Sequence, residues 1–188
     1  SDGSADWVAS HYPNLRLIRN QENLGFAGGN NVGLLAANGD TMVLLNQDTV
    51  VQPGWLAALV GAVASTPEVG IAGAKALYPD GVTLQHAGGY VDVRGEGKHP
   101  GSGARGASDD GHVRDVDYVT GASLAITRRA LEAIGPLDSG FMPAYCEDMD
   151  WCYRARAAGF RVVYVPQAVL IHHEVSAAAP NDYQGMCA

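Results

Sequence analysis

The chain has 188 residues, of which 47% are hydrophobic and 17% are charged, a balance typical of one folded domain and not of a disordered chain. Its 12 basic and 20 acidic residues give a formal net charge of −8, which disfavours nucleic acid as a partner because phosphate backbones attract basic surfaces. No run approaches the roughly 20 apolar residues that a membrane span needs, so we expect no transmembrane segment.

Runs typical of strands alternate along the chain with spacings typical of helices. In chain order the pattern predicts a helix at residues 5–11, a strand at 15–18, a helix at 30–37, a strand at 41–45, a helix at 53–64, strands at 69–74 and 123–127, helices at 128–134 and 147–158, and a strand at 162–165. Near-continuous apolar strands suit a sheet that is covered on both faces. The alternation predicts an α/β fold with a mostly parallel sheet.

The beginning of the chain is unusual for this class. Ser1-Asp2-Gly3-Ser4 leads directly into the first predicted helix, although an α/β sheet normally begins with a strand. We therefore expect that the first strands of the fold are missing and that the chain is truncated.

Residues 88–117 interrupt the alternation with many glycines and few apolar side chains. A segment of this length is too long for an idle connection, so a flexible acceptor-side loop or lid is one interpretation. A disordered insert explains the composition equally well.

Three cysteines, Cys146, Cys152 and Cys187, are scattered and have no C-x-x-C spacing. This pattern favours free thiols in a reducing compartment over a disulfide.

Residues 23–33 form a turn rich in glycine and asparagine that opens a helix. Glycines permit close approach of the backbone, and a helix N-terminus offers free N–H groups to a phosphate or a sugar hydroxyl. A structural turn is the more common explanation of such a segment. The spacing is not G-x-G-x-x-G, so a nicotinamide cofactor is disfavoured.

Asp48 lies in the segment Asn46-Gln47-Asp48-Thr49, which follows the strand at 41–45. Ligands bind at the carboxyl ends of strands in open α/β sheets, and a carboxylate there fits a divalent metal. The alternative is that Asp48 only caps a turn.

Three acids, Glu147, Asp148 and Asp150, begin the helix predicted at 147–158. One of them can face a cleft as a general base while Asp150 pairs with Arg154 one turn later. Acids at a helix start are also explained by the helix dipole alone. Further on, His172-His173 follows the last strand and fits a metal ligand, a base or a structural histidine.

The ordered motifs resemble those of the family-2 glycosyltransferases, especially their bacterial rhamnosyltransferase-like branch. In this chain they are N-x-x-N-x-G-F-A-x-G-N-N-x-G, L-L-N-x-D-T, D-G-x-x-x-Q-x-x-G, V-T-G-A, E-D-x-D-x-C-x-R-x-R-x-x-G and V-P-x-A-x-x-x-H. The resemblance covers residues 1–176. It implies a nucleotide-binding, Rossmann-like glycosyltransferase fold of the A type and an inverting single displacement.

By position, the resemblance assigns roles to individual residues. Asp148 corresponds to the general base, and Asp48 and His172 correspond to the metal ligands, with His173 as the second choice for the histidine. The remaining assignments are Gly25, Asn30, Asn31 and Asn46 on the donor side and Gly121, Glu147 and Asp150 on the acceptor side.

The same resemblance implies the cofactor and the partners. These are Mn²⁺ or Mg²⁺, a nucleotide-diphosphate sugar donor, and a glycan or lipid-linked acceptor of bacterial surface polysaccharide synthesis. We expect a cytoplasmic location, with peripheral association at the inner face of the membrane. Because the D-N-x-S-x-D-G-S element of the family is reduced to Ser1-Asp2-Gly3-Ser4, we also expect this chain to bind donor poorly.

Three other classes fit parts of the sequence. An inactive sugar-nucleotide-binding homologue would keep the motifs without turnover. A nucleotidyltransferase would normally show a basic glycine-rich signature near its start, and a purely structural protein would not need the acidic and histidine segments.

Overall fold

The structure is a computed structural model that describes residues 2–106, 111–141 and 144–173. Its helices are α1 (Ser4–His11), α2 (Gly25–Ala36), α3 (Trp55–Ser65), α4 (Arg128–Ile134) and α5 (Glu147–Ala157). Its strands are β1 (Thr41–Leu45), β2 (Thr49–Val51), β3 (Val69–Leu77), β4 (Leu84–His86), β5 (Tyr90–Val91), β6 (Gly97–Lys98), β7 (Arg114–Asp115), β8 (Ser123–Thr127) and β9 (Arg161–His172). Most of the predicted elements are therefore present, with β3 and β9 longer than expected.

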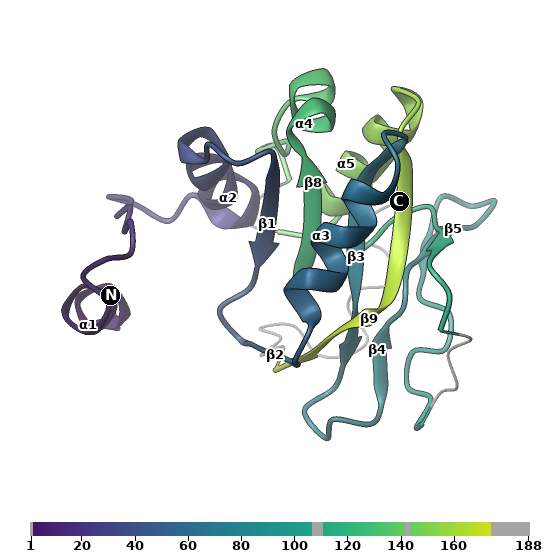
Figure 1. The fold of residues 1–188 in the computed structure, drawn as a ribbon, viewed down its shortest axis with the longest axis horizontal. Coiled ribbons are helices and arrows are strands. Elements are labelled where there is room, and N and C mark those ends of the chain that lie inside the picture. Colours follow the sequence, from purple (N-terminus) through teal and green to yellow (C-terminus); the bar gives the residue numbers. More distant parts are fainter. Residues whose placement is uncertain (1, 107–110, 142–143, 174–188) are drawn as a thin grey trace.

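Seven of the described strands form one mixed sheet with the order β1-β8-β3-β9-β2, to which β4 adds at β3 and β7 at β9 (Figure 1). β3 and β9 pair in parallel. β8 pairs antiparallel with both β1 and β3, so β1, β3 and β9 all point the same way. The α/β class is confirmed, with a core of strands in one direction and antiparallel strands between and around them. The carboxyl ends of β1 and β9 consequently lie at the same edge of the sheet.

The side chains of the central strands point alternately to the two faces of the sheet and pack into one apolar layer on each face. On one face, Ile71 and Ile126 pack with side chains of α2, α4 and α5. On the other face, Ala72 and Val163 pack against α3, which lies along the sheet in Figure 1. The result is a three-layer arrangement that covers the central strands on both sides.

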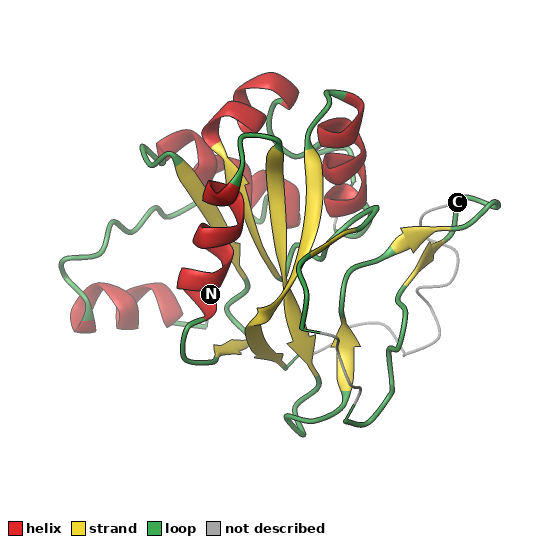
Figure 2. Ribbon diagram, turned by 45° about the vertical axis from the view of Figure 1, so that its right-hand side comes forward, coloured by secondary structure: helices red, strands yellow, loops and turns green. Residues whose placement is uncertain are grey.

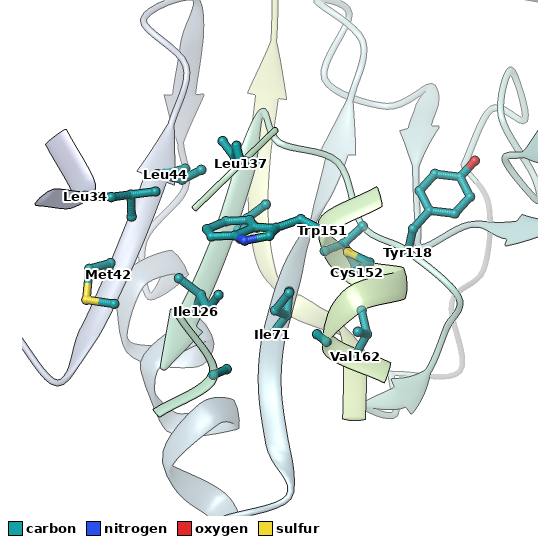
Figure 3. Packing of buried hydrophobic residues seen from close by; sticks show 14 of the residues in the cluster. Leu34, Met42, Leu44, Ile71, Tyr118, Ile126, Leu137, Trp151, Cys152 and Val162 are labelled. Carbon is teal, nitrogen blue, oxygen red and sulfur yellow. The ribbon is translucent and has the colours of Figure 1, made fainter. Parts of the chain in front are cut away.

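Trp151 of α5 lies in the middle of the first layer (Figure 3). Its side chain is fully buried, and its indole N–H donates to the carbonyl oxygen of Gly135 at 2.9 Å. The hydrogen bond satisfies the one polar group of this side chain. The packing fixes α5 on the sheet and so fixes the position of the acids at its start.

The strand predicted at residues 15–18 is wrong. This segment has no regular structure, and Leu15, Leu17 and Ile18 are 61%, 39% and 42% exposed. An apolar run becomes a strand only where a neighbouring strand pairs with it, and none of the described strands pairs with residues 15–18. The preceding helix α1 has no buried residue and stands apart from the sheet (Figure 1).

Residues 88–117 contain short strands in their described part. β5 and β6 pair with each other, and Figure 2 shows this small ribbon beside the large sheet. β7 pairs with β9. A role as a flexible acceptor-side loop stays a prediction. In the described ranges, every helix is too short or too polar to span a bilayer.

Candidate active site

Asp48 and His172 meet at the edge where β1 and β9 end. The pairing of β2 with β9 places Thr49 opposite His172, which brings the preceding Asp48 beside it. The backbone N–H of His173 donates to the carbonyl oxygen of Asp48 at 2.8 Å, while the residue itself is exposed. The two residues that were predicted as metal ligands therefore lie together, and His172 is the nearer histidine.

The facing atoms of this pair lack hydrogen-bond partners. Asp48 Oδ1 and His172 Nε2 are 3.3 Å apart, and both atoms are buried without a hydrogen bond. An unpaired buried polar atom is costly, and two of them pointing at one another fit a shared cation. Across the described residues, no group of three or more His, Cys, Asp or Glu side chains is arranged for a metal, so this part of the chain offers two candidate ligands here.

Asp148 lies at the start of α5, where two backbone N–H groups hold its carboxylate. Gly121 donates to Oδ2 and Met149 donates to Oδ1, both at 2.8 Å. Burial raises the pKa of this half-buried carboxyl above its ordinary value, while the two hydrogen bonds oppose the increase. A carboxylate that is fixed in place and made more basic suits proton abstraction.

Gly121 also brings α2 close to Asp148. A Cβ atom at this position would lie 2.7 Å from Cζ of Phe26 and 3.6 Å from Cβ of Asp148. A side chain at this position would have to displace the ring of Phe26, which belongs to the first turn of α2. Gly121 of the V-T-G-A segment thus lies between Asp148 and the turn that was predicted to bind the donor.

Glu147 is buried beside Asp148, with 4% of its surface exposed and no hydrogen bond to Oε2. Burial, and then the charge of Asp148, raise its pKa to about 7. Asp150 instead binds Arg154, with its Oδ2 atom 2.7 Å from the arginine Nε, as the spacing predicts. Tyr145 and Cys146, just before the helix, both have positive φ angles of 86° and 70°. Such backbone strain is common at functional sites.

Glu147→Gln is expected to remove a pH-dependent loss of stability. Because the folded-state pKa of about 7 lies above the ordinary value of 4.5, the folded protein holds an extra proton between these values. Wild-type stability therefore falls as pH rises through this window, by about 1–3 kcal/mol from this group. A neutral glutamine has no such loss, so urea unfolding from pH 5 to pH 8 should favour the variant increasingly. Parallel curves for the two proteins would contradict this assignment.

The residues predicted on the donor side have structural contacts of their own. Gly25 begins α2 with a φ of 68°, and its N–H donates to Asn23 Oδ1. Asn30 donates to the carbonyl oxygen of Phe26 within the helix. Asn31 donates to the carbonyl oxygen of Leu137 at 2.8 Å and accepts from its N–H at 3.0 Å. These bonds join α2 to the segment after α4, and a donor-binding role for these residues stays a prediction.

Asn46 lies between β1 and Asp48. Its backbone N–H donates to the carbonyl oxygen of Ala122 at 2.9 Å, and its own carbonyl accepts from the hydroxyl of Thr49 at 2.7 Å. These contacts fix the turn that carries Asp48 against the segment that carries Gly121. Contact of Asn46 with a donor stays a prediction.

A cluster of His86, His99 and Tyr118 was missed by the sequence analysis. The Nδ1 atoms of the two histidines are 2.8 Å apart, and the Tyr118 hydroxyl lies 3.3 Å from His99 Nε2. Burial lowers the pKa of His86 to about 3, so this ring is neutral. No motif spacing indicates the cluster, because its members come from three separate segments that only the fold brings together.

The cysteines differ from the expectation at one position. Cys152 is a buried free thiol, as expected. Cys146 is disulfide-bonded, so the prediction of free thiols is wrong there, because spacing along the chain does not show which cysteines meet. Cys187 lies outside the described residues.

Comparison with protein families gives a match over residues 4–183 to the model described as glycosyltransferase-like family 2. The chain is 37% identical over 152 residues to the O-antigen biosynthesis protein RfbC of Myxococcus xanthus, covering 77% of the chain and 12% of that protein. It is 29% identical over 196 residues to the N-acetylglucosaminyl-diphospho-decaprenol L-rhamnosyltransferase of Mycobacterium tuberculosis, covering 93% of the chain and 64% of that enzyme. The chain thus spans less than two thirds of the length of either relative.

Solved structures confirm the expected A-type glycosyltransferase fold. GalNAc-T7 with UDP, GalNAc and Mn²⁺ superposes with a TM-score of 0.71 at 17% identity, covering 92% of this chain and 35% of that one. The mannosyltransferase PcManGT from Pyrobaculum calidifontis, in complex with GDP-Man and Mn²⁺, gives 0.63 at 19% identity, with coverages of 97% and 46%. At these identities the likeness concerns the fold.

Proposed function

Because this chain belongs to glycosyltransferase-like family 2, we propose that it transfers a sugar from a nucleotide-diphosphate donor to a hydroxyl group, with inversion at the anomeric carbon. The observation that carries the proposal is the pair of facing atoms Asp48 Oδ1 and His172 Nε2, which are 3.3 Å apart and buried without a hydrogen bond. They lie at the carboxyl edge of the sheet, where α/β folds bind ligands.

A divalent cation fits this pair. Asp48 and His172 would hold Mn²⁺ or Mg²⁺, with the remaining ligands supplied by diphosphate oxygens and water. When bound, such an ion offsets the charge that develops on the departing nucleoside diphosphate. Both solved structures named above contain Mn²⁺.

The acceptor proton passes to Asp148. In a single displacement, the acceptor oxygen forms a bond to the anomeric carbon as the bond from that carbon to the diphosphate oxygen breaks, and the hydroxyl proton moves to the carboxylate. The hydrogen bonds from Gly121 and Met149 orient the carboxylate, and its raised pKa makes it a better proton acceptor. No covalent intermediate is needed, so no nucleophilic Ser or Cys is assigned.

The relatives support a role in bacterial surface polysaccharide synthesis. One takes part in O-antigen biosynthesis and the other is named as a rhamnosyltransferase acting on a decaprenol-linked sugar. We propose a glycan or lipid-linked acceptor of this type, met at the cytoplasmic face of the membrane, with rhamnosyl or hexosyl transfer as the reaction.

A thermal-shift panel of deoxythymidine, uridine and guanosine diphosphate sugars, with and without MnCl₂, tests the proposal on the intact protein. We expect one donor class to raise the melting temperature only when Mn²⁺ is present, and product to form once a polyprenyl-linked sugar is added. Stabilisation without product across a range of acceptors would favour the inactive sugar-binding homologue. A flat panel would contradict the proposal.

A further inference from the structure

We propose that Gln85 is a positioning residue that holds the ring of His172 in the tautomer whose bare Nε2 faces Asp48. The inference adds a positioning residue to the metal site of the proposed function, and the role of that residue rests on the proposed function. It concerns a side chain of the motif D-G-x-x-x-Q-x-x-G at residues 80–88, to which the family resemblance assigned no role.

The sheet brings Gln85 to His172 from 87 positions away in the chain. β4 pairs antiparallel with β3, with Leu84 opposite Leu77 and His86 opposite Ala76. β3 in turn pairs in parallel with β9, where Leu77 lies opposite Ile171. Successive side chains of a strand point to opposite faces, and Leu84 and His86 are buried while Gln85 is half-buried. Gln85 therefore extends from the opposite face to its two neighbours, toward the end of β9.

The contact fixes the direction of the hydrogen bond. Gln85 Oε1 lies 2.9 Å from His172 Nδ1. A carbonyl oxygen only accepts, so the hydrogen must lie on Nδ1. In the neutral ring, Nε2 then carries a lone pair and no hydrogen.

That lone pair faces Asp48 Oδ1, where the proposed cation would bind. Nε2 is buried without a hydrogen bond and lies 3.3 Å from Asp48 Oδ1, which also lacks one. If Nε2 carried the hydrogen instead, it would donate to Asp48 and occupy the site. Gln85 stabilises the first of these states, because the atom that it places beside Nδ1 is its oxygen, which can only accept from Nδ1–H.

The first test needs no metal. Long-range ¹H–¹⁵N NMR of the ring nitrogens distinguishes the two tautomers, and loss of one ring signal in His172→Gln assigns it. We expect Nδ1–H in the wild type and in Gln85→Glu, whose carboxylate still accepts, and a mixture or Nε2–H in Gln85→Leu. Gln167→Leu is the matched control and should keep the wild-type tautomer. Gln167 is an exposed glutamine on β9, the strand that carries His172, and its side chain donates to the carbonyl oxygen of Gly111. Nε2–H in the wild type would overturn the inference, even if Gln85→Leu does not fold.

The second test is Mn²⁺ affinity, measured by calorimetry with MnCl₂ in the presence of UDP. Loss of the hydrogen-bond partner of a ligating histidine weakens metal binding by about 10–100-fold. We therefore expect Gln85→Leu to bind Mn²⁺ about 10–100-fold more weakly than the wild type, and Gln85→Glu and Gln167→Leu to keep an affinity close to that of the wild type. Wild-type affinity in Gln85→Leu, together with loss in Asp48→Asn, would refute the role of Gln85 and leave the metal site standing. Equal affinity in the wild type and Asp48→Asn would refute the metal site itself, while the NMR result would still decide which tautomer Gln85 selects.

Discussion

Asp148→Asn is expected to lower kcat by about 10²–10⁴-fold, because it removes the carboxylate that we propose as the acceptor of the proton of the attacking hydroxyl. Donor binding should change little, since the base acts on the acceptor. The amide oxygen of asparagine can accept from Gly121 or from Met149 but not from both, so a stability loss of about 1 kcal/mol is expected as well. Product formation at saturating donor gives kcat, and calorimetry with the donor gives its affinity.

The pH dependence supplies a second signature of the base. A proton acceptor must be ionised, so the wild-type rate should fall as pH drops through the pKa of Asp148, which burial holds above the ordinary 3.8. Asp115→Asn is the matched control, because Asp115 is an exposed carboxylate that pairs with Arg161 on the surface. Glu147→Gln tests the adjacent acid. If Glu147→Gln lost turnover and Asp148→Asn kept it, the base would be Glu147.

The meeting of Asp48 with His172 was predictable because it depends on strand direction. Both residues follow apolar strands, and strands that point the same way end at one edge of the sheet. The resemblance then assigned them to one metal site. The partner on the outer side, Gln85, was not predictable from spacing, since its contact depends on how β4 adds to β3. Long-range side-chain contacts of this kind carry no periodic signal along the chain.

The helices of the layers were predictable for a similar reason, because their apolar faces repeat with the helical period. Residues 15–18 show where this reasoning stops. Leu15, Leu17 and Ile18 look like a strand, but an apolar pattern records only the capacity to be buried, and burial needs a neighbour. The short strands β5, β6 and β7 were missed because two residues are too few to show any period.

Asp48→Asn is expected to weaken Mn²⁺ binding by at least about tenfold, because one of the two proposed protein ligands loses its charge. Transfer should fall by about 100-fold or more, since stabilisation of the leaving diphosphate by a metal is worth several kcal/mol and each 1.36 kcal/mol is tenfold in rate. His172→Ala should have the same effects. Calorimetric titration with MnCl₂ and product formation across a range of MnCl₂ concentrations measure both.

The double variant separates a shared ion from two independent contributions. If Asp48 and His172 hold one cation, the second substitution should lower Mn²⁺ affinity and the transfer rate far less than the first, because the first has already removed the site. Asp40→Asn is the matched control, since Asp40 is an exposed aspartate just before β1, at the opposite end of the strand from Asp48. Additive losses would mean that the two side chains act separately. Wild-type Mn²⁺ affinity in both single variants would mean that Asp48 and His172 do not bind the cation, because removal of either ligand of a shared ion must weaken its binding.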